Sequence, residues 1–344
     1  MNPHSLIILF VLALAVAAPA VAQPPGHRGG EAVPRDVREL YDRGLQYLAA
    51  GQSEKGDWTG GMETGPGGTG IALMAFLASG EDPNYGLYSN NVRRALRSII
   101  TEQNAGTGIM GNSMYHHGFA TLALAEAYGA VDERSLWPDG KAPRSIGQAL
   151  ELAVRAAITS QKANPNGAWR YSPSARDADT SVSGAVAVGL LAARNAGIEV
   201  PDEVVDKAVA YYTKMTSASG AVGYSGIGAM GDSVARTSIA ALVYALARRK
   251  DLPQFKATLA NLTGNLEANA GGYLEYARYY QAQALFQGDT AAWEKWNNLL
   301  VRQLKQSQAP DGSIRGGQFG TNFNTSMSLL ALALNYKLLP IYER

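Results

Sequence analysis

The 344-residue chain contains no cysteine. Disulfides cannot stabilise it, so its stability has to come from a hydrophobic core. The same absence excludes a thiol nucleophile, a zinc site built from thiolates and a lipid anchor attached to cysteine. Hydrophobic residues make up 46% of the chain, which is enough to form a large core.

Long runs of like charge are also missing. The 30 Lys and Arg residues nearly balance the 29 Asp and Glu residues, and the net charge is +1. A nucleic-acid groove or a polybasic membrane-binding surface would require concentrated positive charge. Neither nucleic acid nor a charged membrane surface is therefore an expected partner.

The N-terminus has the pattern of a secretory signal. An apolar run from Leu6 to Ala18 precedes Ala20-Val21-Ala22, a small-x-small site that suits cleavage before Gln23. The run is shorter than the roughly 20 residues that a membrane span needs, which disfavours an uncleaved anchor. We predict a signal peptide over residues 1–22, a flexible Pro- and Gly-rich spacer over 23–35, a secreted or periplasmic location, and no stable membrane anchor after cleavage.

Residues 36–344 alternate helical patterns with Gly-rich turns, and we predict that they form one repeat domain. Strand signals are scarce, since no run of alternating β-branched residues is bounded by hairpin turns. Six units emerge, each with a helix, a Gly-rich or Gly-aromatic turn and a second helix. The second helices are expected to begin near equivalent positions, which are Thr69, His117, Ser183, Thr237, Tyr279 and Thr325.

The two helices of each unit differ in composition. The second helices, such as Phe119 to Ala127, are apolar nearly all round and rich in Ala and Gly, which is typical of helices buried on every side. The first helices, such as Pro201 to Lys214, carry more charge. The sequence thus predicts an all-α fold, an α/α toroid (α6/α6 barrel) of six helix-pair repeats, with the apolar helices inside.

Three turns carry a resemblance to a known superfamily. They are GLQYLAAGQSEKGDW from Gly44, ITSQKANPNGAW from Ile158 and LKQSQAPDGSI from Leu304, in which Ile314 stands where the others have Trp. These segments resemble the Gln…Gly-x-Trp repeats of squalene-hopene cyclases and prenyltransferase β subunits. The resemblance covers roughly Asp36 to Leu338 and implies a terpenoid cyclase-like α/α toroid.

The chemistry of that superfamily is not reproduced residue by residue. Squalene-hopene cyclases protonate their substrate with an Asp in a D-x-D-D-T-A motif. When this motif is aligned on Asp179-Thr180, Ala178 stands at the protonating position and Arg176 at the outer Asp. Prenyltransferase β subunits bind zinc through Asp, Cys and His, and this chain has no Cys. Asp177 and Asp179 remain as weak candidates for a catalytic acid, with helix capping as the alternative role for Asp179.

A ligand site is predicted where the second helices begin, because helix N-termini favour negative charge. His116, Arg236 and Arg278 precede the aligned starts and could converge with neighbouring side chains on an anion. The alternative is that the two arginines pair with Asp232 and Glu275 and lock loops. The full candidate set for ligand binding is His116, His117, Asp232, Arg236, Arg278, Tyr279 and Tyr280.

No metal or cofactor site is predicted. His116 and His117 point in different directions on a helix, and the three G-x-G-x-x-G matches do not follow strands of a βαβ unit. We predict an exported protein that binds a small hydrophobic or anionic ligand, or a protein partner, in or at the mouth of its central cavity. The alternatives are a terpenoid cyclase or prenyltransferase-like enzyme and an α/α-barrel polysaccharide-active enzyme. The latter would need paired carboxylates, from among Glu63, Asp177, Asp232 and Glu275.

Overall fold

A computed structural model describes residues 33–342 of the chain, with the exception of residues 60, 62–63, 139 and 268–269. The predicted signal peptide lies outside the described residues. Within them the chain forms twelve α-helices and three short 3-10 helices, and it has no strand beyond isolated bridges. None of the described helices is both long and apolar enough to cross a membrane.

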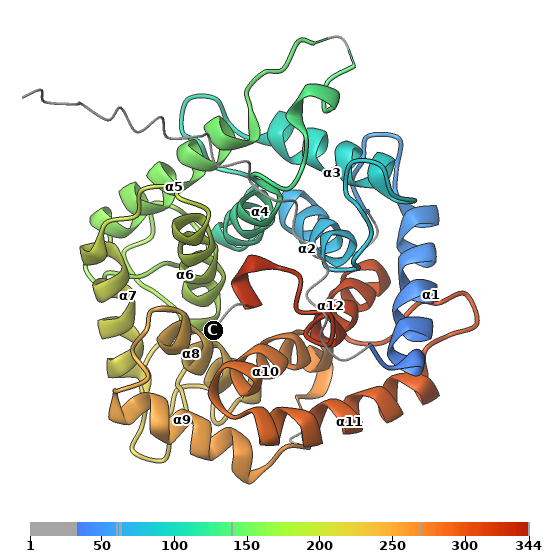
Figure 1. Cartoon of the computed structure of the whole chain (residues 1–344). Coiled ribbons are helices and arrows are strands. Elements are labelled where there is room, and N and C mark those ends of the chain that lie inside the picture. Colours follow the sequence, from blue (N-terminus) through green and yellow to red (C-terminus); the bar gives the residue numbers. More distant parts are fainter. Residues whose placement is uncertain (1–32, 60, 62–63, 139, 268–269, 343–344) are drawn as a thin grey trace, which may run out of the picture. The chain divides into compact units, whose positions relative to one another are not determined.

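The helices alternate between an outer and an inner ring (Figure 1). The outer helices are α1 (Arg35–Gly51), α3 (Ser89–Glu102), α5 (Ile146–Ala163), α7 (Asp202–Met215), α9 (Pro253–Gly264) and α11 (Thr290–Ser307). The inner helices are α2 (Pro66–Leu77), α4 (Met114–Ala127), α6 (Thr180–Asn195), α8 (Val234–Leu246), α10 (Leu274–Gly288) and α12 (Thr321–Ala333).

The inner ring is closed. Each inner helix packs on the next one along the chain, and α12 packs back on α2. Each inner helix follows an outer helix after a turn, so the six inner helices run in the same direction and begin at the same end, which we call the mouth. The predicted α/α toroid of six helix pairs is confirmed.

Small residues let the inner helices approach closely. A Cβ on Gly118 of α4 would lie 2.6 Å from the carbonyl carbon of Ala185 on α6, and one on Gly189 of α6 would lie 2.7 Å from the carbonyl oxygen of Gly118. Both distances are too short for real atoms. The glycines of α4 and α6 are therefore required by the close spacing of these two helices.

A repeated glutamine clamp joins consecutive outer helices. Gln161 at the end of α5 donates through Nε2 to the carbonyl of Gly167 in its own turn and to that of Val204 on α7, both at 2.9 Å. The clamp satisfies buried carbonyl groups of the turn and of the neighbouring helix at once. Three further glutamines make the same pair of hydrogen bonds, and they are Gln52, Gln103 and Gln308.

The fourth clamp closes the ring. Gln308 after α11 donates to the carbonyl of Leu40 on α1 at 2.9 Å, and Arg43 of α1 donates back to the carbonyl of Ala309 at 2.7 Å. Nearby, Lys305 lies 3.5 Å from the Asp36 carboxylate. We refer to these contacts, which join α1 to the end of α11 and the turn that follows it, as the seam.

After α12 the chain turns back into the centre of the ring (Figure 1). The last 3-10 helix, η3 (Pro340–Tyr342), contacts α6, and the backbone N–H of Ile341 lies 3.5 Å from the buried carboxylate of Glu126 at the end of α4. Leu339, Ile341 and Tyr342 are all buried. This C-terminal segment fills the ring at the end opposite the mouth.

Candidate functional site

Three of the aligned positions have the same structural role. His117, Ser183 and Thr325 are the fourth or fifth residue of their inner helices, and each accepts a hydrogen bond from a backbone N–H of the preceding Gly-rich turn. The donors are Met110, Trp169 and Ile314 at 3.2, 3.0 and 2.9 Å. The polar residue at this position of the repeat therefore holds its own turn.

His117 is turned away from the centre of the ring. Its Nδ1 accepts from Met110, and its Nε2 donates to the carbonyl of Ala153 on the outer helix α5 at 3.0 Å. This pattern requires the neutral imidazole with the proton on Nε2. Complete burial lowers the pKa of His117 to about 4.

His116 binds the first turn of α2, and Arg236 binds the loop before its own helix. The Nδ1 of His116 accepts from the backbone N–H of Gly67 at 3.2 Å, and burial lowers the pKa of His116. Arg236 donates through Nε to the carbonyl of Val222 at 3.0 Å and through Nη2 to the carbonyl of Gly231. The predicted loop-locking role of Arg236 is thus supported, but its hydrogen-bond partners are carbonyl groups and not the exposed Asp232.

The remaining predicted residues lie in other parts of the molecule. Arg278 faces the outer helix α11, where it donates to Gln303 at 2.6 Å, and its Nη1 lies 4.0 Å from Glu275. Tyr279 and Tyr280 are buried, with their rings 4.8 Å apart. The predicted convergence of His116, Arg236 and Arg278 on one anion is therefore wrong, because each side chain binds a different neighbour. His116 contacts the start of α2, Arg236 the loop before α8, and Arg278 the outer helix α11.

Asp177 and Asp179 both bind Arg170. Asp177 is exposed and lies 2.6 Å from Nη1, whereas Asp179 is fully buried and lies 3.3 Å from Nε. Asp179 is also the N-cap of α6, where its Oδ1 accepts from the backbone N–H groups of Ser181 and Val182. Helix capping, the alternative role considered from the sequence, is confirmed for Asp179.

Burial raises the pKa of Asp179, although the cap hydrogen bonds and Arg170 oppose this shift. A buried carboxyl with a raised pKa is a feature of general acids. Asp179 is nevertheless 0% exposed, and its hydrogen bonds belong to the helix cap. In this conformation it cannot reach a substrate in solvent.

Aromatic side chains from three inner helices and their loops meet at the mouth. Tyr115, Phe119, Phe323, Phe319 and Tyr276 form a closed cycle of ring contacts, with centroids 5.1 to 6.4 Å apart. These five residues, which we call the aromatic cluster, come from α4, α10 and α12 and the loop before α12. None of the five is among the ligand-binding residues predicted from the sequence, which were chosen for polar groups close to the aligned helix starts.

Further tyrosines extend the aromatic cluster to the surface. Tyr273 packs on Phe319, and Tyr171 packs on Tyr115. Tyr273 and Tyr171 are 50% and 46% exposed, so aromatic surface remains open to solvent. The guanidinium of Arg170 lies over the rings of Tyr171 and Tyr224 at 5.6 and 5.4 Å.

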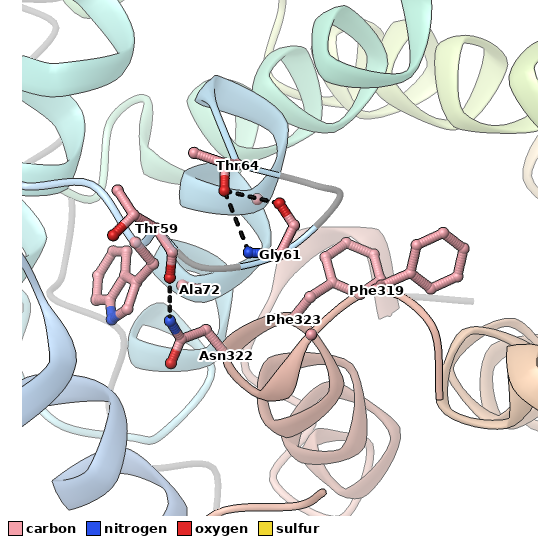
Figure 2. Close-up of a pocket in the computed structure, with 10 residues that line it drawn as sticks. Thr59, Gly61, Thr64, Ala72, Phe319, Asn322 and Phe323 are labelled. Carbon is pink, nitrogen blue, oxygen red and sulfur yellow. Dashed lines mark hydrogen bonds between the residues drawn. The ribbon is translucent and has the colours of Figure 1, made fainter. Parts of the chain in front are cut away.

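A small cavity adjoins the aromatic cluster (Figure 2). Its volume is about 20 Å³, which is room for about one water molecule. Phe319 and Phe323 form one wall, and Asn322 donates to the carbonyl of Thr59 at 2.8 Å on the other side. Any larger ligand at this point has to lie on the outer surface of the cluster or displace its side chains.

No protein-family profile and no curated protein sequence matches the chain. Solved structures do. An inactive variant of the alpha-1,6-mannanase GH76A of Salegentibacter sp. HEL1_6, in complex with alpha-1,6-mannotetrose, has a TM-score of 0.66 and 10% identity, over 88% of this chain and 99% of that one. The type II terpene cyclase MstE from Scytonema has a TM-score of 0.60 and 15% identity, over 88% and 99%. At these identities the fold alone is shared.

The fold neighbours include both kinds of enzyme that the sequence left open, so the chemistry has to be argued from the side chains. Asp177 and Asp179 share one arginine, Glu275 lies beside Arg278, and Glu63 lies outside the described residues. Among the described residues, no group of three or more His, Asp or Glu side chains could hold a metal ion.

The buried neutral His117 predicts a loss of stability in acid. Its pKa is about 4 in the folded protein against 6.5 for an unperturbed imidazole. Below pH 6.5 the unfolded chain takes up a proton that the folded protein does not, so the free energy of unfolding decreases until pH 4. The difference between these two pKa values corresponds to a loss of about 3 kcal/mol in the free energy of unfolding.

Urea unfolding of the wild type and His117→Gln at pH 7 and pH 4.5 measures this loss. The variant lacks the titrating group and is expected to lose less stability between the two values, although it starts from a lower stability at pH 7. His116→Gln serves as the comparison, because His116 is 6% exposed whereas His117 is fully buried. Equal acid sensitivity of the wild type and His117→Gln would show that His117 titrates normally.

Proposed function

We propose that the chain is an exported protein that binds an apolar, isoprenoid-like ligand at the aromatic cluster, without transforming it. The observation that carries the proposal is the cycle of five aromatic side chains from α4, α10 and the α12 region at the mouth. Aromatic and apolar lining with few polar groups is typical of sites for hydrophobic ligands.

The pairing of the polar groups supports an apolar ligand over a glycan. The hydroxyl groups of Tyr115 and Tyr276 bind each other at 3.2 Å, and those of Tyr171 and Tyr224 do so at 2.9 Å. The carboxylates of Asp177 and Asp179 are both paired with Arg170. A sugar needs polar partners for its hydroxyl groups, and these side chains already have partners within the protein.

The positions of the carboxylates support binding without catalysis. A cyclase requires an acid within reach of the substrate, and glycoside hydrolysis requires two carboxyl groups on opposite sides of a bond. Asp179 is fully buried in a helix cap, and Asp177 is bound to Arg170 in solvent. Asp177 and Asp179 therefore provide neither the acid of a cyclase nor the two carboxyl groups of a glycoside hydrolase.

The test is calorimetric titration with geranylgeraniol and with alpha-1,6-mannotetraose. We expect the wild type to bind geranylgeraniol and Phe319→Ala to bind it about tenfold more weakly, since an aromatic pair is worth about 1 kcal/mol beyond its buried area. Tyr85→Ala is the matched control, because Tyr85 is 84% exposed in the loop that follows α2, at the end opposite the mouth. It should bind as the wild type does.

Three outcomes would contradict the proposal. Binding of mannotetraose in preference to geranylgeraniol would favour the glycan alternative. Equal affinity of Phe319→Ala and the wild type would remove the aromatic cluster from the site. A cyclised product formed from a linear isoprenoid only in the presence of the protein would show catalysis.

A further inference from the structure

A second cavity lies on the outer wall of the ring, between α10, α11 and the segment after α9. Its volume is about 180 Å³, somewhat above the roughly 150 Å³ of an engineered protein cavity that holds benzene. Its polar lining includes Arg278, Gln281 and Gln303, and its apolar walls include Trp296, Leu299 and Leu300. A charged group therefore stands beside space that can hold one six-membered ring.

The guanidinium of Arg278 has unused hydrogen-bonding capacity. It carries five N–H donors. Among the described residues its hydrogen-bond partner is Gln303, at 2.6 Å from Nη2, and the Glu275 carboxylate stands 4.0 Å from Nη1, beyond hydrogen-bond distance. The side chain is only 12% exposed, and burial lowers the pKa of Arg278 while Glu275 opposes this. Donors that are largely withdrawn from water without a partner are favourable sites for an acceptor.

The surrounding charges permit an anion here. Glu275 does not line the cavity. Its Oε2 lies close to the backbone at Gly317, where an added Cβ would be 2.9 Å away, and its Oε1 lies 4.0 Å from Nη1 of Arg278. Glu267 lines the cavity but is exposed. The neutral amides of Gln281 and Gln303 can donate to a carboxylate alongside the arginine.

We propose that this cavity binds a small carboxylate with an apolar body of about the size of benzoate, with the carboxylate on Arg278 and the ring among Trp296, Leu299 and Leu300. The site is separate from the aromatic cluster and does not depend on the function proposed there. Arg278 was among the ligand-binding residues predicted from the sequence. It lines this cavity, whereas His116 and Arg236 do not. Charge-assisted bonds from a planar guanidinium to a carboxylate provide the selectivity.

The test uses benzoate and its neutral isostere benzamide, titrated by NMR and by thermal shift. We expect saturable millimolar or tighter binding of benzoate by the wild type, much weaker binding of benzamide, and at least a tenfold loss of benzoate affinity in Arg278→Gln. Arg302→Gln is the matched control, an exposed arginine next to Gln303 on α11, and should bind as the wild type does. Far-UV circular dichroism verifies that both variants are folded.

If Arg278→Gln fails to fold, the wild type still decides the matter. Benzoate should raise the wild-type melting temperature in a concentration-dependent way and benzamide should not. Benzoate should also perturb the NMR resonance of the Trp296 indole N–H. Absence of saturation by benzoate in the wild type, equal binding of benzamide, or unchanged affinity in a folded Arg278→Gln would each overturn the proposal.

Discussion

Deleting Phe323 to Arg344 is expected to unfold the whole ring domain and not only its last repeat. The deletion removes nearly all of α12, which packs on both α10 and α2, and the C-terminal segment in the centre of the ring. Five large apolar side chains of α12 are buried: Phe323, Met327, Leu329, Leu330 and Leu332. At about 1.5 to 3 kcal/mol each, their burial contributes roughly 8 to 15 kcal/mol. This equals the net stability of a typical domain, about 5 to 15 kcal/mol.

Circular dichroism and thermal unfolding of the truncated protein measure the effect. A shorter truncation, from Leu339 to Arg344, is the control, because it leaves all twelve helices in place and removes Leu339, Ile341 and Tyr342 from the centre of the ring. It should melt cooperatively at a lower temperature. If the longer truncation kept most of its helical signal and a sharp melt, the repeats would be stable as an open array, as in solenoid proteins.

The ring could be predicted from the sequence because its repeats depend on local rules. The aligned positions lie three residues after the first residue of α2, α4, α6 and α8. At three of the six aligned positions, His117, Ser183 and Thr325 accept a hydrogen bond from their own turn. A polar residue at a fixed distance from a Gly-rich turn is therefore both a sequence signal and a structural element. The relation to the prenyltransferase and squalene-cyclase repeats remains a prediction beyond the shared fold.

The direction of the side chains could not be predicted from the same alignment. Tyr279 lies five residues after the start of α10, against three in the first four inner helices. A difference of two residues rotates a side chain by about 200° around a helix with 3.6 residues per turn. The alignment thus placed Arg278 at the mouth, whereas the structure directs it toward α11.

The aromatic cluster depends on contacts between distant repeats. Tyr115 and Tyr276 are separated by 161 positions, and their hydroxyl groups meet only because α4 and α10 begin at the same end of a closed ring. Each aromatic residue alone resembles an ordinary core residue in its own repeat. Sequence periodicity reports which residues share a helix, but not which helices face each other across the centre.

Replacing Gly312 with Ala is expected to destabilise the domain by at least about 3 kcal/mol, because this glycine lies at the seam. Its φ is +88°, and a Cβ there would lie 2.1 Å from the backbone carbonyl oxygen of Arg43 on α1. The positive φ alone costs an alanine about 1 to 2 kcal/mol. The remaining loss comes from the overlap with a carbonyl that cannot move away, because α1 is held there by Gln308 and by the bond from Arg43 to Ala309.

Two other glycines separate these contributions. Gly129 has a φ of +80°, and no atom lies within 4 Å of its Cβ position. Gly129→Ala therefore measures only the free energy that an alanine loses by adopting a positive φ. Gly220 has a φ of +83°, and a Cβ there would also lie 2.1 Å from a backbone carbonyl oxygen, that of Ala257 on α9. This contact joins two consecutive repeats. In urea unfolding, Gly312→Ala should match Gly220→Ala and exceed Gly129→Ala. A Gly312→Ala variant that behaved like Gly129→Ala would mean that the seam is open in solution, because only a closed ring brings Arg43 against residue 312.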